Sequence, residues 1–217
     1  MWKRAFDPDN FVFRWIAKLT DLVILSLLWV FISLPIVTVG AATTALYDCV
    51  VKCIRGKDPH TLSRFFRVFR ENFRVSALCS LIWAAVGSLL WWLGSVVLTV
   101  ANSGNRTAAV IYVAYCIFML LPMGIFCWLF PLLSRFTFGT GGLNRAAFQF
   151  TLAHLPSTVI IVLLSLEAGV LCIQYWFPIL FAPALVALLW SLFMEPAFKK
   201  HMPSENSENN EKKLPPC

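Results

Sequence analysis

Long uncharged, hydrophobic runs alternate with short basic segments along the whole chain. Five of the runs are long enough to cross a hydrocarbon core of about 30 Å, which takes ~20 helical residues. Helix breakers inside or beside the runs shorten the span that each one can form. The pattern therefore predicts about five transmembrane helices, at residues 19–34, 75–100, 107–133, 158–175 and 178–194.

The segment after the first span does not fit a simple crossing. Pro35 ends the first run, and Thr38 and Gly40 follow at once. Residues 41–55 then have helical periodicity, with small or apolar side chains on one stripe at Ala42, Ala45, Leu46, Cys49 and Cys53. A return helix over about residues 38–51 is short and polar for a full crossing, so we expect it to be buried against other helices.

A basic amphipathic helix is predicted over residues 62–74, just before the second span. Its aromatic face consists of Phe65, Phe66, Phe69 and Phe73. Its flanking arginines are Arg64, Arg67, Arg70 and Arg74. Aromatic residues on one side with arginines around them are typical of a helix that lies in the lipid headgroup plane. The alternative is a docking helix for a soluble partner, such as an ATPase.

Composition supports a membrane class over a soluble one. Of the 217 residues, 59% are hydrophobic and 13% are charged, whereas soluble chains have about 25% charged residues. We predict an all-α, polytopic membrane protein with one integral membrane domain, residues 1–200. Residues 201–217 form a polar tail that we expect to be disordered.

The distribution of Lys and Arg predicts the orientation, because cytoplasmic loops are rich in both. Seven of them lie between the first two spans, at Lys52, Arg55, Lys57, Arg64, Arg67, Arg70 and Arg74. The next loop has only Arg106, and the one after it has Arg135 and Arg145. The loop 52–74 and the C-terminus should therefore be cytoplasmic. Five crossings would place the basic N-terminus outside; a bent hairpin at Pro35 would return it to the cytoplasm, and both alternatives stay open.

Two places carry candidate chemistry. Glu167 is a formal charge inside a predicted span, so it is paired, protonated or facing a cavity. It is either a site for a proton or a substrate cation, or a structural carboxyl bonded to a neighbouring group. Asp48 and Lys52 are one helical turn apart on the return helix, where they either line a polar pocket or form a local ion pair.

Other function classes find little support in the residues. The chain has no Ser/His/Asp, Cys/His or paired-carboxylate arrangement, so we expect no enzyme activity and no cofactor. His and Cys do not occur at zinc-ligand spacing. The net charge of +7 lies in short segments between apolar runs, which favours anionic lipid over nucleic acid as the partner. The sequence Leu-Ser-Arg-Phe occurs twice, at 62–65 and 133–136, but four matched residues do not establish a duplication.

The segment Ser33-Leu-Pro-Ile-Val-Thr-Val-Gly-Ala-Ala-Thr-Thr-Ala-Leu-Tyr47 resembles the hallmark of the YesL-like family of bacterial integral membrane proteins. Its Pro35, Thr38 and Gly40 carry the likeness, and Phe69-Arg-Glu-Asn-Phe73 and Phe130-Pro-Leu-Leu-Ser-Arg-Phe136 add to it. The likeness covers about residues 5–200. It implies a location in the bacterial cytoplasmic membrane, because the family is found there. Its genes often lie beside carbohydrate ABC-transporter components, which implies an accessory role in sugar uptake but no established activity.

Two functions follow as hypotheses. The first is an accessory or partner-binding membrane protein linked to carbohydrate uptake, with ABC-transporter subunits as partners and the loop 52–74 as the contact surface. The second is a small transporter that works as a homo-oligomer, with Glu167 in its pathway. Co-purification with transporter subunits would favour the first, and solute flux by the pure protein would favour the second.

Overall fold

The computed structural model describes residues 11–55, 60–102, 106–136, 139–175 and 177–201. Within them the chain is all-α, as predicted, with no strand. The seven α-helices are α1 (Phe11–Ile32), α2 (Val39–Cys49), α3 (Thr61–Asn102), α4 (Arg106–Arg135), α5 (Thr140–Ala153), α6 (Leu155–Gln174) and α7 (Ala182–His201). The expected disordered tail falls, beyond His201, outside the described residues.

Four described segments are long and apolar enough to cross a membrane, against the five spans that the sequence predicts. They are Ile36–Cys53, Thr61–Asn102, Arg106–Arg135 and Leu155–Gln174. The two sets differ in the return segment after Pro35, which qualifies, and in the last apolar helix, Ala182–Phe198, which is shorter. The first expected span corresponds to α1, which is not among the four. These helices are compatible with a membrane protein.

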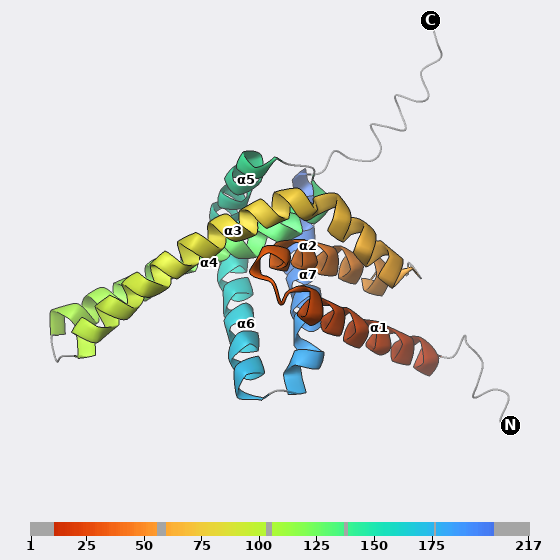
Figure 1. Cartoon of the computed structure of the whole chain (residues 1–217), viewed down its shortest axis with the longest axis horizontal. Helices are drawn as coiled ribbons and strands as arrows, with labels where there is room; N and C mark the ends of the chain where they lie inside the picture. Colours follow the sequence, from red (N-terminus) through yellow and green to blue (C-terminus); the bar gives the residue numbers. More distant parts are fainter. Residues whose placement is uncertain (1–10, 56–59, 103–105, 137–138, 176, 202–217) are drawn as a thin grey trace, which may run out of the picture.

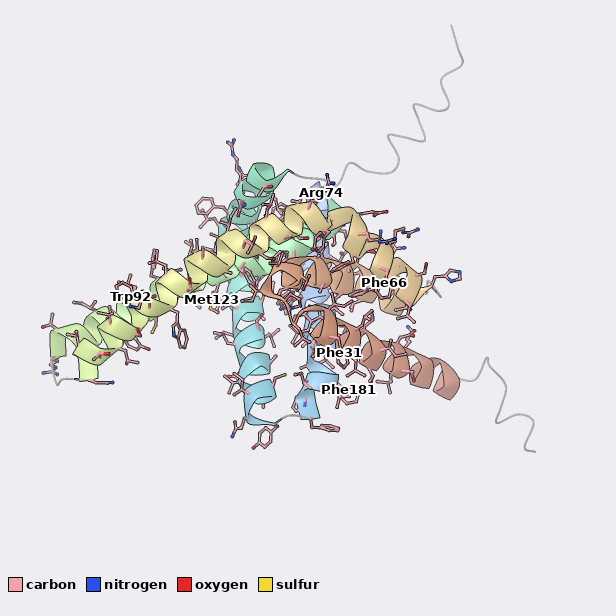
Figure 2. All side chains as sticks on the ribbon, viewed as in Figure 1. Phe31, Phe66, Arg74, Trp92, Met123 and Phe181 are labelled. Carbon is pink, nitrogen blue, oxygen red and sulfur yellow. The ribbon has the colours of Figure 1, made fainter. Side chains whose placement is uncertain are left out.

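The predicted amphipathic helix and the second span form one continuous helix, α3, of 42 residues. At 1.5 Å per residue it is about 63 Å long, twice the thickness of a hydrocarbon core. It bends in the region of Arg74 (Figure 2). The Ser76 hydroxyl donates there to the carbonyl oxygen of Asn72 at 2.5 Å, a contact that often bends helices.

The packed centre of the molecule, which we call the hub, is the region where α2 meets α3, α4 and α7. Its two groups of buried apolar side chains include Tyr47, Trp128 and Phe198 in one and Leu25, Val50 and Phe65 in the other. The predicted stripe of the return helix is buried here, with Ala42, Ala45, Leu46, Cys49 and Cys53 each at most 5% exposed. α2 is thus the helix around which the hub is built.

Three extensions leave the hub in different directions (Figure 1). One is α1, and another is the pair α6 and α7. The third is the hairpin of α3 and α4, whose residues 84–102 and 106–119 we call the arm. Ala108 is the one buried side chain among the described residues of the arm, and side chains such as Trp92 point outward along it (Figure 2). Such an apolar surface is stable only where lipid or another protein covers it.

Candidate functional site

The reversal after α1 sets the position of α2. Pro35 has an extended backbone, with φ −77° and ψ 129°, so the helix cannot continue through it. The Thr38 hydroxyl donates to the Pro35 carbonyl oxygen at 2.7 Å and also to the carbonyl oxygen of Ile32. A short 3-10 helix, η2 (Ile36–Thr38), then leads into α2. Pro35 and Thr38 therefore act locally, by turning the chain back into the hub.

Gly40 lets α2 approach both α3 and α4 closely. Its amide donates to the Ser80 hydroxyl at 3.0 Å. A Cβ atom at this position would lie 2.3 Å from both Phe130 Cε1 and the Ser80 hydroxyl oxygen. Small residues at helix crossings are a common way of packing helices in membranes. Gly40 is therefore a packing residue of the hub.

A buried carboxylate lies at the C-terminal end of α2. Asp48 is 1% exposed, and its Oδ2 accepts a hydrogen bond from Arg64 Nε at 2.6 Å. Its Oδ1 faces Lys52 Nζ at 3.3 Å and an Arg135 guanidinium nitrogen at 3.7 Å, without a hydrogen bond of good geometry. Three cations from different parts of the chain therefore surround one carboxylate.

Arg135 connects Asp48 to a second carboxylate. Its Nε and one terminal nitrogen lie 2.9 Å and 2.7 Å from the same Glu195 oxygen. The Tyr47 hydroxyl also points at this oxygen, at 3.4 Å. The Arg135 and Glu195 side chains are 9% and 13% exposed, so water screens their interaction little.

Five charged side chains meet here, and we call them the charged cluster: Asp48, Lys52, Arg64, Arg135 and Glu195. They come from the four helices that meet in the hub. Asp48 and Lys52 belong to α2 and to the π-helix η3 (Val50–Arg55) that follows it, and Arg64, Arg135 and Glu195 to α3, α4 and α7. Two negative and three positive groups meet, and Lys52 is the most exposed of them at 44%. Burying charges is costly unless they are paired, so the cluster holds the four helices in one arrangement.

Sequence reasoning missed two of the five members of the charged cluster. It singled out Asp48, Lys52 and Arg64 as candidate residues, but it used Arg135 only for orientation and within sequence motifs, and it did not select Glu195. One signal was available: Arg64 and Arg135 are the arginines of the two Leu-Ser-Arg-Phe sequences, and both face Asp48. The repeated motif thus marks two cations that share one carboxylate.

The four arginines at the start of α3 do not share one environment. Arg64 points inward, with 14% of its side chain exposed, while Arg67, Arg70 and Arg74 are exposed. The phenylalanines also divide: Phe65 is buried and stacks with Phe69, whereas Phe66 is 48% exposed. Phe66 therefore lies with the exposed arginines.

This outer surface of α3 is hollowed. Ser63, Phe66, Arg67, Arg70 and Glu71 line a depression of about 550 Å³ among the described residues. Figure 2 shows Phe66 on the first turns of α3. The depression is open, and the Phe66 ring, two guanidinium groups and one carboxylate line it, which suits an amphipathic surface with acidic groups.

Glu167 lies apart from these groups. It is exposed on the outer surface of α6, and the structure does not bring it to Asp48 or Lys52. Within the described residues, no group of three or more His, Cys, Asp or Glu side chains is arranged to hold a metal ion. Of the three candidate residues, Asp48 and Lys52 therefore lie in the charged cluster, and Glu167 lies outside it.

Residues 22–94 match the model of a protein family of unknown function, DUF624. The match covers the second half of α1, the reversal at Pro35, α2 and most of α3. It thus includes Asp48, Lys52 and Arg64 but not Arg135 or Glu195. No curated protein and no solved structure matches the chain.

Proposed function

We propose that this protein is an accessory, partner-binding protein of the bacterial cytoplasmic membrane, linked to carbohydrate uptake through ABC-transporter subunits. The observation that carries the proposal is the outer surface of α3, where Phe66, Arg67, Arg70 and Arg74 remain exposed although Arg64 turns inward to Asp48. The hub does not need these residues for its own packing, so they are free to contact a partner.

The link to carbohydrate uptake rests on the YesL-like character that we propose for the chain. The match to the DUF624 model supports this assignment, since YesL-like proteins carry that domain. The genetic neighbourhood of that family then suggests transporter subunits as the partners. We also propose that the loop 52–74 and the C-terminus face the cytoplasm, where an ATPase subunit would be available.

The test is co-purification from native membranes. We expect the full-length protein to retain subunits of a carbohydrate ABC transporter, identified by mass spectrometry. The double variant Arg67→Glu/Arg70→Glu should lose them, because like charges would then meet across the contact. Arg106→Glu/Arg145→Glu is the matched control, since both residues are exposed but lie on α4 and α5. Retention of the subunits by the first variant, or their absence from the wild type, would contradict the proposal.

Lipid is the rival occupant of this surface. If the basic residues serve only as an interfacial anchor, Arg67→Glu/Arg70→Glu will weaken binding to anionic lipid and leave every co-purified protein unchanged.

The alternative function, a small transporter, would place Glu167 in the pathway of the solute. Because Glu167 faces away from the hub, a pathway through it would have to run between copies of the chain. Solute flux in liposomes that is lost on Glu167→Gln would favour that function.

A further inference from the structure

A small pocket lies where the reversal after α1 meets α3 and α4. Figure 1 shows the start of α2 beside these two helices. The pocket has a volume of about 140 Å³, and a protein cavity of about this size holds one benzene molecule. It therefore has room for about six non-hydrogen atoms. Its lining consists of Ile36, Val39, Ser80, Trp83, Ala84 and Phe126.

Ser80 gives the pocket a hydrogen-bond donor that is not in use. Its hydroxyl oxygen accepts a hydrogen bond from the Gly40 amide at 3.0 Å, but among the described residues no acceptor bonds its own proton. The Trp83 indole nitrogen already donates to the Asn144 side chain at 2.9 Å. Ser80 is only 5% exposed, and a buried donor without an acceptor is unfavourable. The pocket therefore suits a group with one acceptor on an apolar body.

The surroundings of the pocket are apolar. Its lining residues come from Ile36–Cys53, Thr61–Asn102 and Arg106–Arg135, three of the segments that are apolar enough to cross a membrane. The side chains of Ile36 and Phe126 are 64% and 38% exposed, so the pocket is accessible from outside the protein. In a membrane, the molecule that meets such an opening is a lipid.

The position of Ser80 along α3 corresponds to the level of the lipid ester groups. Arg74 is the last charged residue of α3 and is exposed, which places it among the lipid phosphates. Ser80 follows six residues later, about 9 Å along the helix. The headgroup layer on each side of a bilayer is about 5–8 Å thick. The ester carbonyls lie at the inner edge of this layer, and Trp83 is of a residue type enriched at this level.

We propose that the pocket binds a membrane phospholipid by the start of one acyl chain, with the ester carbonyl oxygen accepting a hydrogen bond from the Ser80 hydroxyl. The first carbons of the chain lie against the Trp83 and Phe126 rings, which contact each other at 6.3 Å between centroids. The bound lipid then joins the reversal after α1 to α3 and α4. The pocket is separate from the depression on the outer surface of α3, so this proposal and the proposed function can fail independently.

Competition between diester and diether phospholipids tests the hydrogen bond, because only the diester has carbonyl oxygens. Purified full-length protein in detergent receives equal amounts of diester and diether phosphatidylethanolamine, and native mass spectrometry counts the bound lipids. We expect a preference of about two- to tenfold for the diester, the effect of one hydrogen bond. Ser80→Ala should remove the preference, and Ser88→Ala, exposed on the same helix, should keep it. Equal binding by the wild type, or an unchanged preference in Ser80→Ala, would overturn the proposal.

Filling the pocket gives a second test that leaves Ser80 in place. Ala84→Leu adds a larger side chain to the lining, whereas Ala85→Leu adds the same side chain at the exposed position next to it. Ala84→Leu should release the preferred lipid and lose the preference for the diester, and Ala85→Leu should bind like the wild type. If Ala84→Leu kept the preference, or if both variants lost it equally, the diester would bind elsewhere and the pocket would be rejected as its site.

Discussion

Arg135 donates two hydrogen bonds to one oxygen of Glu195, across 60 positions of sequence. The same guanidinium reaches within 3.7 Å of Asp48, so it ties the ends of α4 and α7 to α2. Such a connection fixes the relative positions of helices that apolar packing alone would allow to slide. The charged cluster is therefore the feature of the hub that specifies its geometry.

Removing the central carboxylate should destabilise the protein strongly. In Asp48→Ala, Arg64 and Arg135 lose a counter-ion in a buried place, and breaking a buried ion pair costs about 3–5 kcal/mol. Unfolding in detergent micelles, followed by circular dichroism, measures the loss. Glu71→Ala, an exposed carboxylate on α3, should change the stability by less than about 0.5 kcal/mol. Equal stabilities would show that the charged cluster has no structural role.

The coupling between Asp48 and Arg64 can be measured separately. Arg64→Ala should also be destabilising, but the double variant Asp48→Ala/Arg64→Ala should lose less than the sum of the two, because no charge of that pair is left alone. A double-mutant cycle of the free energies of unfolding gives the interaction. Simple additivity would mean that the 2.6 Å contact contributes nothing.

The shape of the Arg135 side chain should matter as much as its charge. Lysine has one compact ammonium group and cannot place two nitrogens on Glu195 while facing Asp48. Arg135→Lys should therefore cost about 1.5–3 kcal/mol, the range for a hydrogen bond to a charged group. Arg145→Lys, on the exposed side of α5, is the control and should be nearly neutral. If both substitutions were tolerated equally, a point charge would suffice at position 135.

Gly40→Ala should disturb the hub, because the new methyl group would need to occupy space held by Phe130 and Ser80. Overpacking of this kind costs about 1–3 kcal/mol. Gly87→Ala, on the same α3 that Gly40 contacts, meets nothing within 4 Å and should be neutral or stabilising by ~0.5–1 kcal/mol. The melting temperatures of the two variants should differ in opposite directions from the wild type. If the melting temperatures of both variants shifted by the same amount in the same direction, α2 would not approach α3 and α4 closely at Gly40.

The Thr158 hydroxyl should stabilise the protein, because it is the hydrogen-bond acceptor of Trp128 on another helix. It accepts a hydrogen bond from the Trp128 indole nitrogen at 2.9 Å, and both residues are buried. Thr158→Val leaves this donor without an acceptor, which costs about 1–3 kcal/mol. Thr99→Val is closely matched, since each threonine also bonds a carbonyl four residues earlier in its own helix. Only the first variant should lower the melting temperature.

Much of the fold followed from local pattern, and the departures have identifiable causes. The stripe from Ala42 to Cys53 was placed correctly because every third or fourth residue of a helix shares a face. Phe66 was assigned to the aromatic face, yet it lies one position beyond the stripe of Phe65, Phe69 and Phe73 and is exposed. The boundary expected at residue 75 does not exist, because nothing in that region of α3 breaks a helix.

The sequence by itself determined that the chain is helical, apolar and divided by Pro35, since hydropathy, periodicity and proline act within a few residues. Only the tertiary structure decided which charges meet. Asp48, Arg64, Arg135 and Glu195 are far apart in sequence, and their partners depend on where four helices cross. The sequence shows which residues are charged and therefore require a partner. Only the packing of the helices determines which residue that partner is.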